Sequence, residues 1–395
     1  MGWSSSRQTG LLYRDNRSFG GYTVIVPNGG DHAYLLGPDG RIVHAWNIPW
    51  FRPGYAYLTP AGTLLARGRL LQQTGIGWDY VPDKADILVE LDWQSNLIWR
   101  WEGADLHHGM YRTPNGNTLV IIWSPLPDRF HERICGGLPK DYWDTVLKKD
   151  PNFREFLLEG MGVGGRPKMD GHYGDSIVEV DPRGTIVKQW NTFDHLSPEE
   201  EPTCAFCPSF EWTHANSIEM TADGDVLVSF REISLVARID WETGKVRWKY
   251  GRPIISHQHD PSETPGGNIL IFDNGAHHPI QGRTRVVEID PTTDRVVWQY
   301  SGDPVFSFRC LHIGGCQRLP NGNTFICEGE CGRLMEVTPD KDICWEWVSP
   351  FVHDFKGKPN IQIFKTRTYT AEAPELAGRD LSGAACAAIN DRYRL

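Results

Sequence analysis

Four histidines stand at matching positions ahead of short turns, and imidazole suits nucleophilic, acid–base and metal-binding roles near neutral pH. His214 and His312 each lie eight residues before a turn, whereas His108 and His259 each lie six residues before one. In that order the turns read ADGD, PNGN, PNGN and PGGN. Because side chains on a strand alternate with a period of two, even offsets place all four imidazoles on the same face of extended segments. We therefore treat these histidines as one functional set.

Polar residues accompany the set at positions that suit the chemistry of an anionic group. Asn216 lies two residues after His214. Arg231 ends the segment VLVSFR, which follows the turn ADGD. A neutral imidazole can attack an electrophile, a second can protonate a leaving group, and a guanidinium can compensate negative charge on oxygen atoms. His257 and Tyr57 are further candidates for contact with a substrate, together with His312.

A second repeat shows which elements must position these residues. Six segments each read as a strand, an acidic turn and a strand ending in tryptophan, and these residues are Trp46, Trp99, Trp190, Trp248, Trp298 and Trp345. The gaps between them are 53, 91, 58, 50 and 47 residues, which is the spacing of propeller blades with one insertion. Each unit reads as four strands. We predict an all-β, six-bladed β-propeller, with the tryptophans at equivalent blade positions and the histidines converging on the axis.

One insertion and one closure complete the predicted architecture. Residues 123–173 break the strand rhythm, and we predict a helical cap insertion there within a single propeller domain of residues 1–395. Apolar residues at helical spacing indicate two short helices within residues 139–159, interrupted at Pro151. The first tryptophan hairpin has no approach strand before it. We therefore expect residues 361–369 to pair with residues 22–26, so that both chain termini close the ring.

Composition limits the partners and the compartment. The net charge of −10 and the lack of a basic run argue against a nucleic-acid or acidic-membrane partner. No window is apolar enough for a transmembrane helix, and the first residues lack the apolar core of a secretory signal. A cytoplasmic protein that binds a small aromatic substrate is the expectation.

The nine cysteines do not indicate a disulfide framework, because their number is odd and the chain is long. Cys204 and Cys207 form a C-x-x-C pair, which is half of a zinc-binding pattern. No second half follows at the spacing of a zinc ribbon. We expect reduced and mostly buried thiols.

Several segments together resemble the bacterial arylsulfate sulfotransferases, whose fold is a six-bladed propeller. The matching segments are THANSI at 213–218, VSFR at 228–231, QH at 258–259, FDNG at 272–275, and HH at 107–108 ahead of PNGN at 114–117. The resemblance spans roughly residues 55–347. His312 departs from it, because the family pattern would have a small hydroxyl residue there. The family is also usually exported, with an extension before the ring.

This resemblance implies transfer of a sulfuryl group from an aryl sulfate to a phenol, without a nucleotide sulfate donor. Carried over by motif, His259 would be the nucleophile that becomes sulfohistidine. His108, His214 and Arg231 would surround the sulfuryl oxygens. No cofactor is expected under this interpretation.

Two alternatives remain open from the residues alone. Four converging imidazoles could instead hold iron, copper, zinc or manganese, and the ligands would be His108, His214, His259 and His312. Such an enzyme would be an oxygenase or lyase on a propeller scaffold. A metal site occupies the lone pair that a nucleophile needs, so the two functions cannot share the same histidines. The third possibility is a non-catalytic propeller that binds a small ligand.

Overall fold

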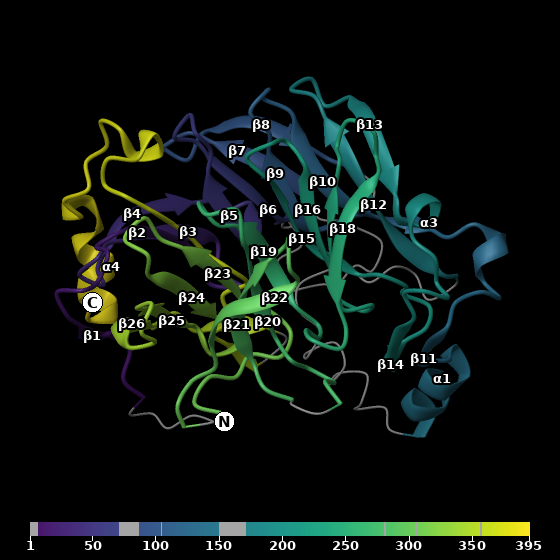
Figure 1. Ribbon diagram of the computed structural model, residues 1–395. Coiled ribbons are helices and arrows are strands. Elements are labelled where there is room, and N and C mark those ends of the chain that lie inside the picture. The colour runs from purple at the N-terminus through teal and green to yellow at the C-terminus, as the bar shows by residue number, and fades with distance from the viewer. Residues whose placement is uncertain are drawn as a thin grey trace. The chain divides into compact units, whose positions relative to one another are not determined.

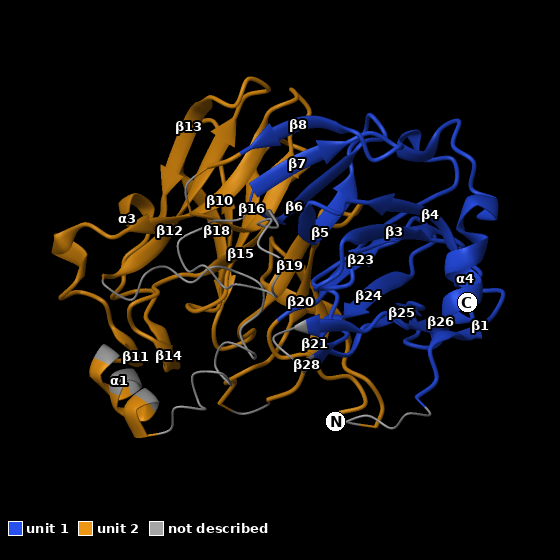
Figure 2. Ribbon diagram, turned by 180° about the vertical axis from the view of Figure 1, so that it is seen from behind, with its two compact units in different colours: residues 1–79, 87–101, 313–395 blue, residues 80–86, 102–312 orange. Residues whose placement is uncertain are grey.

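The structure is a computed structural model, and it describes residues 7–70, 87–103, 105–149, 171–279, 282–304, 306–355 and 358–395 (Figure 1). The chain is mostly β-structure. Six antiparallel sheets form the six blades of a β-propeller, which confirms the predicted fold class. Among the described residues, none of the helices is both long and apolar enough to cross a membrane. The chain divides into two compact units, residues 1–79, 87–101 and 313–395, and residues 80–86 and 102–312 (Figure 2).

Unit 1 contains three blades. The first has the strand order β29-β2-β3-β4, with bounds Arg367–Tyr369, Tyr22–Ile25, His32–Leu36 and Ile42–Asn47. The second runs β5 to β8, with bounds Phe51–Leu58, Leu64–Leu70, Ile87–Leu91 and Leu97–Trp101. The third has the order β1-β26-β25-β24-β23, with bounds Gly10–Arg14, Ile343–Val348, Arg333–Val337, Thr324–Glu328 and Gly315–Arg318. The hairpin of β27 (His353–Phe355) and β28 (Lys358–Asn360), the 3₁₀ turns η2 (Gly329–Cys331), η3 (Pro374–Leu376) and η4 (Ala384–Cys386), and the helix α4 (Ala387–Tyr393) complete the unit.

Both chain termini enter blades of unit 1, as the sequence predicted. Strand β29 pairs antiparallel with β2, with Tyr22 opposite Tyr369 and Val24 opposite Arg367. An isolated bridge between Pro27 and Ile363 extends this pairing. Strand β1 adds a second closure that was not predicted, because it pairs with β26 as a fifth strand. These pairings cover strand edges that would otherwise be exposed to other chains.

Unit 2 contains the other three blades. Their strands are β9 (Leu106–Arg112), β10 (Thr118–Pro125), β12 (Tyr173–Val180) and β13 (Ile186–Asn191); β15 (Ala215–Met220), β16 (Val226–Phe230), β17 (Leu235–Ile239) and β18 (Val246–Gly251); and β19 (His259–Glu263), β20 (Ile269–Asp273), β21 (Arg285–Asp290) and β22 (Arg295–Tyr300). Outside the blades lie η1 (Asp128–Phe130), β11 (Gly136–Leu138), α1 (Lys140–Lys149), α3 (Thr192–His195) and β14 (Thr203–Pro208). One core cluster of unit 2 joins its first two blades through buried residues such as Ile121, Trp190, Trp212 and Val228.

The predicted insertion lies between β10 and β12 of one blade. Helix α1 confirms the first of the two predicted helices. The second falls on residues 150–170, which lie outside the described residues. Strand β11, within the insertion, pairs in parallel with β14, a strand that the sequence pattern did not indicate. The capping role of the insertion stays a prediction.

The six tryptophans all lie on the outer strand of their blades, but they do not occupy equivalent positions. In every blade, the pairing between the third strand and the strand that carries the tryptophan has one register irregularity at the same place. This irregularity gives a common reference for comparing residue positions between blades. Trp99, Trp248, Trp298 and Trp345 share one position, whereas Trp46 and Trp190 lie two residues further along. The residues equivalent to these two are Trp101, Tyr250, Tyr300 and Trp347.

The prediction of one equivalent tryptophan per blade was therefore wrong for two of the six. A shift of two residues keeps a side chain on the same face of a strand, so the sequence pattern could not separate the two positions. The true repeat is a buried aromatic residue that faces a buried apolar residue on the third strand, for example Trp46 opposite Ala33 and Trp347 opposite Leu334.

Replacing Trp46 by alanine should destabilise the protein by about 3–5 kcal/mol, because its side chain is fully buried and leaves a large cavity. The indole nitrogen also donates a hydrogen bond to the Asp92 carbonyl oxygen at 3.2 Å. Trp298, which is half-buried, is the matched control, and its replacement by alanine should lower the free energy of unfolding clearly less. Chemical denaturation of both variants measures the difference, and equal losses would contradict the two-position assignment.

Candidate functional site

The four predicted histidines all belong to unit 2. His108 lies in β9 and His259 begins β19, whereas His214 directly precedes β15 and His312 lies between β22 and β23. The approach segments are not regularly extended, because His108 and His214 have φ values of 47° and 50°. The pairings of β9, β15 and β19 also carry register shifts. Such irregularities redirect side chains near functional sites.

His108 and His214 lie close together. Their ring centroids are 4.7 Å apart with a tilted, edge-on orientation. The neighbouring His107 places its Nδ1 2.8 Å from Nδ1 of His108, and its ring stacks on Trp123 at 3.8 Å. His107 is fully buried, and burial lowers its pKa. The pair His107–His108 thus acts as a packed support for the face that meets His214.

Asp175 on β12 fixes the backbone around His214 and was not found from the sequence. Its fully buried carboxylate accepts hydrogen bonds from the Ala215 amide at 2.7 Å and from the Thr213 hydroxyl. Its other oxygen lies 3.0 Å from Nε2 of His107. One carboxylate therefore connects the two histidine segments.

Glu211 controls the protonation of His214. Its buried carboxylate contacts Nδ1 of His214, three residues further along the chain. Burial lowers the pKa of His214, but the charge and hydrogen bond of Glu211 outweigh this effect, and the pKa lies above its usual value. This contact directs the Nε2 side of the ring away from Glu211. A charged imidazolium is thus favoured at this position.

Arg231 is held by the fully buried Glu232. Its Nη1 donates a hydrogen bond to Oε1 of Glu232 at 2.5 Å, and its backbone amide donates to the His214 carbonyl oxygen at 2.9 Å. Burial raises the pKa of Glu232, but Arg231 more than offsets this effect and the carboxyl stays ionised. These two hydrogen bonds therefore connect Arg231 both to Glu232 and to the backbone of His214.

His259 presents a defined tautomer. Its Nδ1 lies 2.7 Å from Oδ1 of Asn274, and the Asn274 amide nitrogen donates to the Cys310 carbonyl oxygen at 2.8 Å. The amide orientation makes Oδ1 an acceptor, so Nδ1 of His259 carries the proton and Nε2 carries the lone pair. Burial lowers the pKa of His259 well below its usual value, and Arg231 adds to this effect. His214 and His312 contribute in the same direction, whereas the hydrogen bond with Asn274 opposes it.

The remaining predicted site residues have different surroundings. Asn216 is fully buried, and its amide donates to the Gln258 carbonyl oxygen at 2.8 Å, so it positions the backbone directly before His259. His257 is also fully buried and directs Nε2 toward the sulfur of Cys207 at 3.1 Å. His312 is half-buried. Tyr57 lies on β5 of unit 1, half-buried, with its ring 5.9 Å from that of Tyr55.

The sequence did not predict three buried carboxylates of the site, because none of them belongs to a repeated motif. These are Asp175, Glu211 and Glu232. A signal was present in the sequence. Asp175 lies within the largely apolar strand β12, Glu211 directly precedes a tryptophan, and Glu232 lies two residues beyond the apolar strand β16. Carboxylates in such positions are rarely buried without a cationic or hydrogen-bonding partner.

Comparison with known proteins places the chain in a family. The family model described as Arylsulfotransferase (ASST) matches residues 155–350, which include His214, Arg231, His259 and His312 but not His108. Among the curated proteins, none matches the chain.

Solved structures share the fold at low sequence identity. A protein of unknown function from Bacteroides caccae has a TM-score of 0.53 and 14% identity, over 88% of this chain and 98% of that one. A streptogramin B lyase has a TM-score of 0.47 and 12% identity, over 92% and 98% of the two chains. The likeness to the Bacteroides caccae protein concerns the fold alone. By its family match and its six-bladed propeller, the chain belongs to the arylsulfotransferase family.

Proposed function

We propose that this protein transfers a sulfuryl group from an aryl sulfate to a phenolic acceptor through a sulfohistidine at His259, without a nucleotide sulfate donor. The observation that carries the proposal is the hydrogen bond from Nδ1 of His259 to Asn274. It leaves the lone pair on Nε2, which is the nitrogen that attacks. Family membership and the nearby guanidinium support sulfur in an anionic ester as the target.

In the first half-reaction, Nε2 of His259 attacks the sulfur atom of the aryl sulfate. The nitrogen–sulfur bond forms while the bond between sulfur and the aryl oxygen breaks, and the electron pair leaves with the phenolate oxygen. His214 then supplies a proton to this oxygen, because Glu211 favours its protonated form. Arg231 compensates the negative charge on the sulfuryl oxygens in the transition state.

The second half-reaction reverses the first with a different phenol. His214, now neutral, accepts the proton of the acceptor hydroxyl, whose oxygen attacks sulfur and displaces Nε2 of His259. The enzyme returns to its starting protonation state. His108 lies at the edge of His214, where it can contact the same oxygens as a further donor. The sequence and structure of the site are compatible with many phenols.

The four-histidine metal alternative receives less support. Arg231 acts electrostatically on His259 and on His214, and a fixed guanidinium charge opposes a divalent cation but favours an anion. Among the described residues, one group of possible metal ligands has its ligand atoms within 4.8 Å of one another. None of these four histidines belongs to that group. The site is therefore better suited to an anionic ester.

The direct test of the function is transfer between two phenols. Purified protein is incubated with 4-nitrophenyl sulfate and an unsubstituted phenol, and both free 4-nitrophenol and the new phenyl sulfate are quantified. The proposal expects equal amounts of both products, and parallel lines in double-reciprocal plots of initial rate against donor concentration at several fixed acceptor concentrations. Release of 4-nitrophenol with inorganic sulfate alone would identify a hydrolase and overturn the transfer assignment.

Glu211→Gln should shift the alkaline limb of the pH profile of kcat/KM to lower pH. Glu211 raises the pKa of His214, so its removal lowers this pKa, and the proton donor is lost at a lower pH. Arg231 and Glu232, which also act on His214, remain in place. The pKa shift should be the same with both donors, but the loss of rate above this pKa should be larger with phenyl sulfate than with 4-nitrophenyl sulfate, whose phenolate needs less protonation. An unchanged limb with both donors would remove His214 as the acid.

A further inference from the structure

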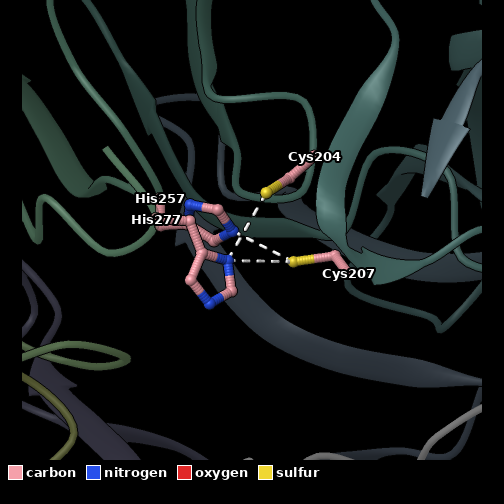
Figure 3. A group of neighbouring side chains, drawn as sticks. All are labelled: Cys204, Cys207, His257 and His277. Atoms are coloured by element: carbon pink, nitrogen blue, oxygen red, sulfur yellow. Dashed lines mark hydrogen bonds between the residues drawn. The ribbon is translucent and has the colours of Figure 1, made fainter. Parts of the chain in front are cut away.

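Four side chains that the proposed reaction does not use gather in unit 2. They are Cys204, Cys207, His257 and His277, and their sulfur and ring nitrogen atoms all lie within 4.8 Å of one another (Figure 3). Both cysteines belong to β14, His257 lies between β18 and β19, and His277 follows β20. The cluster thus joins three segments that are far apart in the sequence.

The distances within the cluster match those around a tetrahedral metal ion. The Cys207 sulfur lies 3.1 Å from Nε2 of His257 and 3.6 Å from Nδ1 of His277, and the Cys204 sulfur lies 3.4 Å from the same Nδ1. Around tetrahedral zinc, with bonds of about 2.3 Å to sulfur and about 2.1 Å to nitrogen, sulfur and nitrogen ligands are about 3.6 Å apart. Figure 3 shows both imidazoles facing the two sulfur atoms.

The tautomer of His257 is set as metal-binding histidines require. The Ser256 hydroxyl donates to the Ala276 carbonyl oxygen at 2.6 Å, so it accepts a proton from Nδ1 of His257 at 3.2 Å. The lone pair of His257 therefore lies on Nε2, which faces Cys207. A hydrogen bond from the second ring nitrogen is the usual way in which proteins orient such a ligand.

One oxygen of a buried carboxylate lies beside the cluster without a hydrogen-bond partner in the part of the chain that the structure describes. Oε2 of Glu232 lies 3.8 Å from Nε2 of His257, and within the described residues this fully buried oxygen has no hydrogen-bond partner. The other oxygen of this carboxylate pairs with Arg231, so a cation held in the cluster would face Oε2.

We propose that Cys204, Cys207, His257 and His277 bind one Zn²⁺ ion in a closed, structural site. Two thiolates and two imidazoles in tetrahedral arrangement are the donor set that proteins use for structural zinc. The ion would fasten the segment of His257 to β14, and His259 lies two residues further along. This inference goes beyond the proposed function and does not depend on it.

The sequence did not indicate this site, because the two cysteines and the two histidines are far apart along the chain. His257 follows Cys207 by 50 residues and His277 follows it by 70. The cysteines are free and mostly buried, as expected, and the proposal adds a metal ion at the C-x-x-C pair. Both histidines have φ values of 55° and 58°, a left-handed conformation in which histidine is enriched over bulky residues. The local backbone thus brings both rings to the cysteines.

The test is the zinc content of the whole chain, purified under reducing conditions without chelator and measured by plasma mass spectrometry. The proposal expects one zinc per chain. Cys207→Ser and His277→Ala should each lower this content at least about tenfold. His277 is exposed, so its removal leaves the core intact. The matched controls are Cys135→Ser, an exposed thiol, and His278→Ala, the next residue of the same loop, and both should keep the zinc.

Cobalt gives an independent readout of the ligands. Replacing zinc with Co²⁺ should produce intense tetrahedral d–d bands and a thiolate-to-cobalt charge-transfer band, both weakened in Cys207→Ser. Absence of zinc after dialysis against micromolar Zn²⁺, a Cys204–Cys207 disulfide in protein purified without oxygen, or zinc lost in His312→Ala rather than His277→Ala would each overturn the proposal. None of these measurements requires sulfuryl transfer, so their outcome is separate from that of the proposed function.

Discussion

Replacing His259 by alanine is expected to lower sulfuryl transfer by about 10⁴-fold or more, because the reaction loses its nucleophile. Alanine cannot form the nitrogen–sulfur bond, and the acceptor phenol then has no activated intermediate to attack. Steady-state rates with 4-nitrophenyl sulfate and phenol measure the loss. The matched control is His195→Ala, which removes an imidazole that stacks on Trp190 elsewhere in unit 2 and should leave the rate unchanged.

A merely structural role of His259 would give a different result. His259 is buried against Asn274, so its removal could lower the rate by loosening β19. Added imidazole distinguishes the two roles, since it can enter the space left in His259→Gly and carry the sulfuryl group itself. Partial recovery of turnover with imidazole supports the nucleophile. A variant that retains a tenth or more of the original rate without imidazole would contradict it.

Arg231→Lys is expected to lower kcat/KM by about 10²–10³-fold, through loss of the fixed charge pattern that faces the sulfuryl oxygens. Lysine keeps the charge but not the planar fork that binds Glu232. Arg231→Met, which leaves the buried Glu232 without this cation, should also lose stability, by about 3–5 kcal/mol. Activity and denaturation therefore have to be measured on the same preparations.

A double variant separates these two effects of Arg231. Arg231→Met with Glu232→Gln removes both charges and keeps similar side-chain volumes, so much of the stability should return. The rate should stay low, because no cation remains for the transition state. Recovery of the rate together with the stability would show that Arg231 serves only to neutralise Glu232.

The fold could be predicted because its blades share a repeated sequence pattern. Turns of the PNGN type recur four times and strands ending in tryptophan recur six times. The pairing of residues 361–369 with residues 22–26 follows once the strands are counted. The position of each tryptophan along its strand could not be predicted. Relative to the register irregularity, Trp46 lies two residues further along its strand than Trp298, and a shift of two residues leaves the side chain on the same face of the sheet. The register irregularity that separates them has no residue signature.

The site could be predicted only where it follows the same repeats. The repeated offsets singled out His108, His214 and His259, and of these the structure places the rings of His108 and His214 4.7 Å apart. Partners that belong to a single blade carry no such pattern. Glu211 and the zinc-type cluster depend on how loops fold, which long sequence separations conceal. Their recognition required three-dimensional distances.

The covalent intermediate is the most direct test of the account. Protein is incubated with 4-nitrophenyl sulfate without acceptor, digested at alkaline pH, and analysed by mass spectrometry for the added mass of one sulfuryl group. The account predicts this mass on the peptide that contains His259, its disappearance when phenol is added, and its absence in His259→Ala. A burst of 4-nitrophenol without any modified peptide, or a stable sulfuryl group on another residue, would contradict it.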